Sequence, residues 1–111
     1  MTRLVRKKDL VKGTGPSAEK GDIVSIDVEG YLPKGDKVLS EQGLAFALGS
    51  RRVIPGLEYG IQGMSAGGTR EIRVPPHLAY GDKGTATIPP KAALRLVVKL
   101  KQVQKGKTAT K

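Results

Sequence analysis

The residues best suited to chemistry lie in one proline-bounded segment, VPPHLAYGDKGTATIPP, at positions 74–90. It holds the only histidine, His77, and one of the three tyrosines, Tyr80, between two Pro-Pro pairs. The prolines restrict the backbone, and no regular secondary structure fits the pattern. We therefore expect a stiff loop that presents Tyr80, with His77 as an exposed loop residue.

The residues that most metal sites and covalent catalysts require are missing. The chain has no cysteine, and its lone histidine has no cluster of carboxylates with which to hold a metal ion. Five serines would share His77 as their only base, with no supporting motif. The glycine-rich stretch at 63–69 lacks the Lys-Ser/Thr pair of a phosphate-binding loop. We predict no metal and no cofactor.

The net charge of +10 is concentrated at the two ends of the chain. Residues 1–12 carry +4 and residues 99–111 carry +5, whereas residues 13–98 carry only +1. Basic ends attract polyanions, so nucleic acid or the ribosome is a possible partner, and the ends would form one patch if they lay near each other.

No apolar run has the length of a signal peptide or of a membrane-spanning helix. We therefore expect a cytoplasmic protein, or a nuclear one if its source is eukaryotic, with no membrane partner. Nothing in the sequence requires more than a monomer.

Alternation of apolar and polar residues predicts several one-sided strands. The pattern is clear at residues 23–32, 44–48, 69–74 and 93–101, and a return strand begins at 37–39. The first dozen residues are interpreted as a further strand. Repeated strands of this kind without long helices are typical of an antiparallel sheet with one solvated face.

One segment has a helical spacing instead. Within VIPGLEYGIQGM, at 53–64, Leu57, Ile61 and Met64 recur every three or four residues, and Pro55 suits a first helical turn. Glycines weaken this helix in isolation but permit close approach to another surface. The predicted fold class is α+β, a bent antiparallel β-sheet wrapped around one short α-helix.

The predicted domain organisation is simple. Residues 1–104 are expected to form a single domain, and residues 105–111 a basic, flexible C-terminal tail.

Several motifs together resemble the FKBP-type peptidyl-prolyl cis-trans isomerases. The landmarks are LGS followed by VIPG, then GIQGMSAGGTR, PPHLAYG, IPP and the final strand LRLVVKL. Upstream, KGTGPSAEKGDIVSIDVEGYL is similar to the opening of the family. The similarity extends from about residue 8 to residue 103, and it implies the same bent sheet over one helix.

The resemblance also implies a pocket for X-Pro segments of polypeptides. In the family, the backbone N–H at the position of Ile54 and the hydroxyl at the position of Tyr80 donate hydrogen bonds to the bound chain, so these are the predicted catalytic residues. The implied substrate-binding residues are Val28, Val38, Leu39, Leu44, Phe46, Val53, Leu57, Ile88 and Leu96.

Six of these positions depart from the family pattern. Leu57 stands where the family usually has the Trp of the pocket floor, and Leu39 stands where it has an aspartate. Aromatic residues of the family are replaced at four further positions, Val28, Val38, Leu44 and Leu96. The pocket stays apolar but loses its flat walls, so we expect a weak isomerase that binds the family's macrolides poorly.

The same substitutions leave an alternative open. The fold could serve as a non-catalytic interaction module whose pocket is filled by its own side chains, Leu57 and Leu96 above all. An open pocket would count against this alternative.

Overall fold

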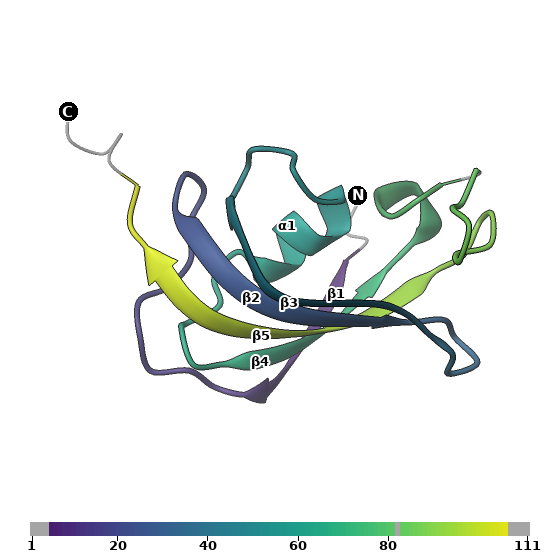
Figure 1. Cartoon of the computed structure of the whole chain (residues 1–111). Helices are drawn as coiled ribbons and strands as arrows, with labels where there is room; N and C mark the ends of the chain where they lie inside the picture. The colour runs from purple at the N-terminus through teal and green to yellow at the C-terminus, as the bar shows by residue number, and fades with distance from the viewer. Residues whose placement is uncertain (1–4, 82, 107–111) are drawn as a thin grey trace.

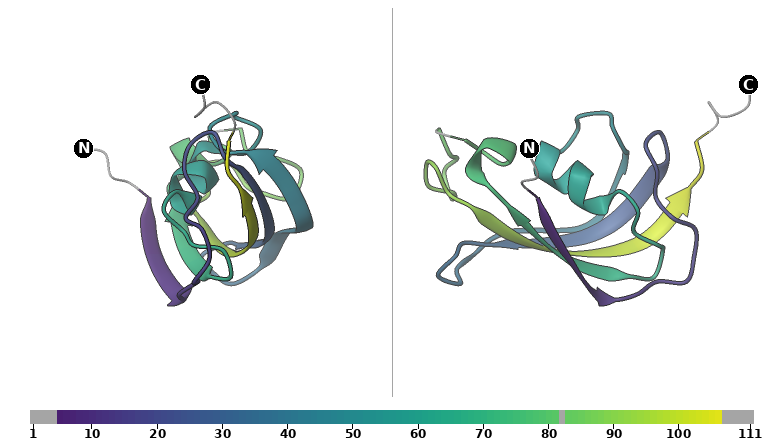
Figure 2. Two further views of the ribbon diagram at one scale, coloured as in Figure 1. Left: turned by 90° about the vertical axis from the view of Figure 1, so that its left-hand side faces the viewer. Right: turned by 180° about the vertical axis from the view of Figure 1, so that it is seen from behind.

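A computed structural model of the chain describes residues 5–81 and 83–106. Its five strands form one antiparallel sheet in the order β1-β4-β5-β2-β3. The sheet is strongly curved, and the short helix α1 lies on its concave side (Figures 1 and 2). The predicted α+β class is confirmed. In chain order the elements are β1 (Arg6–Val11), β2 (Ile23–Tyr31), β3 (Lys37–Ala47), α1 (Pro55–Ile61), β4 (Thr69–Val74), the 3₁₀ turn η1 (Pro76–Leu78) and β5 (Leu94–Gln104).

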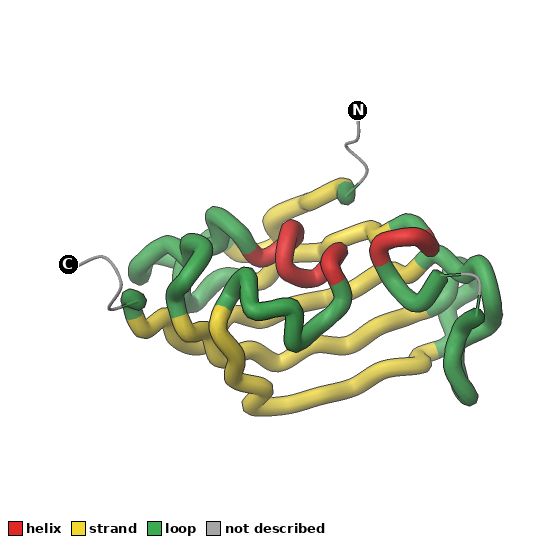
Figure 3. Tube along the Cα trace, turned by 90° about the horizontal axis from the view of Figure 1, so that it is seen from above, coloured by secondary structure: helices red, strands yellow, loops and turns green. Residues whose placement is uncertain are grey.

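The alternation in the central strands produces a sheet with one dry face. In β2, Val24, Ile26 and Val28 are at most 1% exposed, while the residues between them face outward. The buried residues of β4 and β5 continue this apolar surface. Seen from above, the helix lies over the strands of the sheet (Figure 3), and its main contacts are with β4 and β5. The two turns of helix need this surface, because so short a helix is unstable alone in water.

Strand β3 is longer than its sequence pattern indicates. The segments expected at 37–39 and 44–48 belong to one strand, Lys37–Ala47, whose register with β2 shifts between Ile26 and Val28. The backbone N–H of Gly43 donates to Asp27 Oδ1 at 2.8 Å beside this irregularity. Residues 40–43 are exposed and polar, so they carry no alternation that could have revealed the strand.

Close contact between α1 and β4 depends on two glycines. A Cβ atom on Gly60 would lie 2.4 Å from Ile72 Cδ1, and one on Gly56 would lie 2.2 Å from a Val74 methyl group. Both distances are far inside van der Waals contact. The glycines that weaken the isolated helix therefore allow it to dock.

Arg70 fixes the end of the same helix. It is 9% exposed, and its Nη1 donates to the carbonyl oxygens of Gly60, at 2.8 Å, and Gln62, at 3.1 Å. Its Nε donates to Asp9 Oδ1 at 2.7 Å, which lowers the pKa of Asp9. One guanidinium thus links β1, β4 and the C-terminal carbonyls of α1.

The predicted C-terminal tail is only partly within the described residues. Its first two residues contact Asp22: Lys105 Nζ donates to Oδ2 at 2.7 Å, and the N–H of Gly106 donates to Oδ1 at 2.9 Å. These bonds lower the pKa of Asp22, the one from Lys105 most of all. Residues 107–111 lie outside the described residues. In the part of the chain that is described, no helix is long and apolar enough to cross a membrane.

Replacing Gly60 by alanine tests the docking of the helix. Helix propensity alone would favour alanine by about 1 kcal/mol. We instead expect a loss of about 1–3 kcal/mol in the free energy of unfolding, because the new methyl group collides with Ile72. Chemical denaturation measures this difference. Adding Ile72→Val, which removes the nearest carbon, should restore part of the loss, and a Gly60→Ala variant at least as stable as the parent would contradict close packing.

Candidate functional site

An open pocket of about 450 Å³ lies on the concave side of the sheet. Residues from β2, β3, α1, β5 and the two loops that precede α1 and follow η1 form its walls. The lining residues are Val28, Leu39, Glu41, Leu44, Arg52, Val53, Ile54, Leu57, Tyr80 and Leu96. Eight of the eleven predicted site residues meet here, from segments far apart in the sequence.

The pocket has an aliphatic floor. Val28 from β2, Leu96 from β5 and Leu57 from α1 are each at most 3% exposed, yet all three border the cavity. Leu39 and Leu44 on β3 are partly buried and pack against the same core. No aromatic ring forms this floor, so the cavity offers branched aliphatic surface to a ligand.

The backbone before α1 borders the pocket at Ile54. Ile54 is the residue that caps the helix, in an extended conformation (φ −61°, ψ 148°). Its carbonyl oxygen accepts from the N–H groups of Leu57, at 3.0 Å, and Glu58, at 3.3 Å. Among backbone bonds between described residues outside regular elements, none is donated by the Ile54 N–H.

Glu58 holds the loop that carries Val53 and Ile54. The Glu58 side chain is 8% exposed, and its Oε2 accepts from the N–H of Gly49 at 3.1 Å and of Arg51 at 3.0 Å. Arg51 has a left-handed backbone (φ 66°), a conformation that costs free energy for a residue with a side chain. A carboxylate that fixes the two N–H groups stabilises this turn, and sequence reasoning missed its role.

Tyr80 borders the pocket from the proline-bounded loop. The loop is held by its own backbone bonds: the N–H of Gly81 donates to Pro76 O at 2.9 Å, and the N–H of Lys91 donates to Gly81 O at 2.8 Å. A further bond of 2.8 Å joins the N–H of Thr85 to the carbonyl of Ile88. His77, in η1, is exposed, as expected. The loop is therefore an ordered support for Tyr80.

Three predicted lining residues lie outside the cavity wall. Phe46 and Ile88 are 6% and 3% exposed and belong to the packed core, and Val38 is partly buried against that core. Two charged residues that were not predicted, Glu41 and Arg52, border the cavity instead. Their exposed positions gave no pattern in the sequence, because a solvated surface residue and a residue at a pocket rim look alike there.

This arrangement suits binding and not proton or group transfer by side chains. The lining has one hydroxyl, from Tyr80, one carboxylate, from the exposed Glu41, and no histidine, serine or cysteine. Within the described residues, no three His, Cys, Asp or Glu side chains gather as a metal site would require. What remains is an apolar slot with a few donors, the usual composition of a site that orients a small apolar group.

Comparison with known sequences gives a family match. Residues 15–101 match the sequence profile described as FKBP-type peptidyl-prolyl cis-trans isomerase. The 46 kDa FK506-binding nuclear protein of Spodoptera frugiperda is 42% identical over 102 residues, which are 87% of this chain and 25% of that protein. FK506-binding protein 2 of Yarrowia lipolytica is 43% identical over 88 residues, or 75% of this chain and 61% of that protein. The chain spans about a quarter or less of the first three relatives matched.

Solved structures agree with the sequence match. A peptidyl-prolyl cis-trans isomerase from Pseudomonas syringae superposes with a TM-score of 0.81 at 29% identity, covering 91% of this chain and 76% of that one. The crystal structure of AtFKBP13 gives a TM-score of 0.80 at 33% identity, covering 86% and 90%. The bent sheet over one helix is thus an arrangement shared with these proteins.

Replacing Glu58 by leucine tests how the pocket loop is held. Without the carboxylate, the N–H groups of Gly49 and Arg51 lose their acceptor, and their amide hydrogen exchange should accelerate about tenfold or more. NMR-detected exchange measures both amides. Glu58→Gln keeps an acceptor oxygen and should have the smaller effect. The N–H of Leu48, bonded to Asp22 O, serves as the internal control, and equal acceleration there would mean general destabilisation.

Proposed function

The chain belongs to the FKBP-type peptidyl-prolyl cis-trans isomerases, and we propose that its aliphatic pocket binds X-Pro segments and catalyses their isomerisation at a reduced rate. The observation that carries this proposal is the open pocket of about 450 Å³ that brings Ile54 and Tyr80 together over an apolar floor. Family membership alone would not tell whether the leucine side chains fill the pocket and leave no room for a ligand.

The reaction needs little from side-chain chemistry. Rotation about an X-Pro bond is opposed by a barrier of about 18–20 kcal/mol from amide resonance. An apolar site favours the twisted amide, in which resonance and charge separation are reduced, over the planar and better solvated one. The proline ring would occupy the floor formed by Val28, Leu57 and Leu96.

The proposed hydrogen bonds orient the substrate. The N–H of Ile54 faces no partner in the backbone bonds described above and would donate to a substrate carbonyl. The hydroxyl of Tyr80, from the proline-bounded loop, would donate to a second carbonyl. Two donors from separate loops would orient the chain around the rotating bond.

The reduced rate follows from the shape of the walls. A flat aromatic surface stacks on a proline ring over more area than a branched leucine does, and aromatic contacts are worth about 0.5–1.5 kcal/mol beyond their burial. Leu57 and Leu39 replace the aromatic floor and the carboxylate expected from the family pattern. We propose that the protein binds prolyl peptides loosely and acts as a folding helper with slow turnover.

The alternative of a non-catalytic interaction module remains a proposal of lower rank. It required a pocket filled by Leu57 and Leu96, and the open cavity above these side chains weighs against it. An interaction module could still use the same slot to hold a proline-containing segment without releasing it quickly.

Partners and location are proposals as well. We propose a monomer that acts on proline-containing polypeptides in the cytoplasm, with the nucleus as the alternative in a eukaryotic cell. The relatives from Spodoptera frugiperda and Drosophila melanogaster are named as nuclear proteins. Association of the basic ends with nucleic acid or the ribosome is a separate proposal, and such binding should weaken steeply with salt.

The test of catalysis is NMR exchange spectroscopy on a short Leu-Pro peptide. The protein should accelerate cis-to-trans exchange, and Tyr80→Phe should reduce the acceleration about two- to tenfold, the value of one hydrogen bond. Ile54→Ala should also reduce it, by removing apolar contact at the pocket wall. Tyr59→Phe is the matched control, since Tyr59 is 52% exposed on α1 and outside the pocket.

Two results would contradict the proposal. Absence of acceleration at high protein concentration would favour the interaction module. If Tyr80→Phe, like the control Tyr59→Phe, left the acceleration unchanged, the Tyr80 hydroxyl would have no role in catalysis. The pocket itself would still be the proposed site.

Binding of FK506 tests the role of the walls. We expect little thermal stabilisation of the unaltered protein by FK506, because stabilisation grows with the ratio of ligand concentration to Kd. Leu57→Trp should increase the stabilisation, with affinity rising about threefold to tenfold from added aromatic contact. Tight binding to the unaltered protein would show that aliphatic walls suffice.

A further inference from the structure

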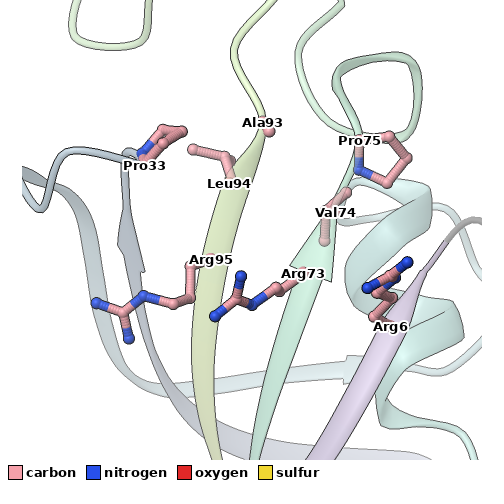
Figure 4. Close-up of a pocket in the computed structure, with 8 residues that line it drawn as sticks. All are labelled: Arg6, Pro33, Arg73, Val74, Pro75, Ala93, Leu94 and Arg95. Atoms are coloured by element: carbon pink, nitrogen blue, oxygen red, sulfur yellow. The ribbon is translucent and has the colours of Figure 1, made fainter.

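The outer, convex face of the sheet carries a row of arginines that the isomerase pocket does not use. Strand register pairs Arg6 with Arg73, and Arg73 with Arg95, so the three residues stand side by side on β1, β4 and β5. Figure 4 shows all three on the side of the sheet away from the helix. We call Arg6, Arg73 and Arg95 the arginine row.

Cations outnumber acids on this part of the sheet. The outward positions of β1, β4 and β5 also include Lys8, two residues from Arg6, and Lys99, four residues from Arg95. The acid facing outward among them is Glu71, which lies 3.8 Å from Arg73 Nη2 and 3.6 Å from Arg95 Nη1. Both contacts are longer than a hydrogen bond. On the neighbouring strand β2, Glu29 also faces outward and accepts from Tyr31 and Lys37, so two carboxylates offset the cations only in part.

The arginines are held in place but open to solvent. The side chain of Arg73 is 68% exposed and that of Arg95 is 37% exposed. Arg95 also lies over the ring of Tyr31, its register partner on β2, with 4.5 Å between the guanidinium carbon and the ring centroid. Stacking on the ring orients the guanidinium while its outer N–H groups stay available.

A shallow apolar pocket adjoins the row. Its volume is about 290 Å³, and Pro33, Pro75 and Ala93 line it together with the three arginines. Figure 4 shows the two prolines at the end of the strands, above the guanidinium groups. The surface thus places cations beside aliphatic carbons, which suits a ligand whose phosphates alternate with less polar groups.

We propose that this face binds the phosphodiester backbone of single-stranded nucleic acid. Neighbouring strands lie about 4.8 Å apart, so three arginines span roughly 10 Å, longer than a single phosphate group. Guanidinium groups match phosphate oxygens in pairs. A flexible strand can follow a convex surface, whereas a rigid duplex touches it over a short length. An acidic peptide would offer carboxylates to the same arginines, and the test below compares the two ligands.

This surface differs from the basic ends. Arg73 and Arg95 come from the nearly neutral middle of the chain, and only Arg6 comes from a basic end. It also lies on the opposite face from the isomerase pocket: Leu96 borders that pocket, and its neighbour Arg95 points outward. A bound strand would therefore leave the X-Pro site accessible.

The test is fluorescence anisotropy with labelled oligothymidylate and the full chain. Replacing all three arginines of the row by glutamine should weaken binding at least tenfold at about 50 mM salt and reduce the slope of log affinity against log salt by roughly 2. Replacing the same three by lysine keeps the charge and should stay within a few-fold of the parent. The matched control replaces three lysines of the two ends, Lys12, Lys107 and Lys111, by glutamine, with the same loss of net charge.

Four outcomes would overturn the proposal. The first is a loss in the control as large as in the arginine variant, which would assign binding to overall charge or to the ends. The second is no binding by the parent protein at low salt. The third is tighter binding of a labelled oligoglutamate than of oligothymidylate, with the same dependence on the row, which would make an acidic protein the partner. The fourth is tighter binding of duplex DNA. Thermal melting of each variant separates loss of binding from loss of fold.

Discussion

The close contact between α1 and β4 is the constraint on which the rest of the structure depends. Gly56 and Gly60 bring the helix backbone against Val74 and Ile72, where a single methyl group would not fit. Arg70, on β4, then donates hydrogen bonds to the carbonyl groups at the end of the helix. Because the helix sits so near the sheet, the turn before it lies at the pocket wall. The position of the pocket is thus a consequence of helix packing.

The proposed site joins a backbone group to aliphatic side-chain walls. The proposed donor at Ile54 belongs to the main chain, so no side-chain substitution would remove it as long as Glu58 holds the preceding turn. The walls consist of side chains such as Leu57 and Leu39, which a substitution can replace. A fold of this kind can lose affinity for flat ligands while it keeps the geometry that orients a peptide. We regard this division as the physical basis for the proposed slow isomerase.

The two faces of the sheet present separate chemistries from the same strands. On β5, Leu96 is fully buried beside the pocket, and Arg95 faces outward under the curve of the sheet. Period-two alternation makes this possible, because neighbouring residues in a strand point to opposite sides. A strand that closes an apolar site on one face can therefore contribute a cation to a polyanion site on the other.

The sequence by itself determined the fold class and the buried faces of β2, β4 and β5, because alternation and local motifs are properties of neighbouring residues. Its resemblance to the family also predicted Ile54, Tyr80 and the floor leucines as site residues. Only the tertiary structure decided which of those residues share a cavity, that Phe46 belongs to the core, and that Glu58 supports the loop. The arginine row shows the same limit. Summing the charges along the chain places the excess of positive charge at the two ends. Strand register joins residues far apart in sequence, and it places three arginines side by side on one face.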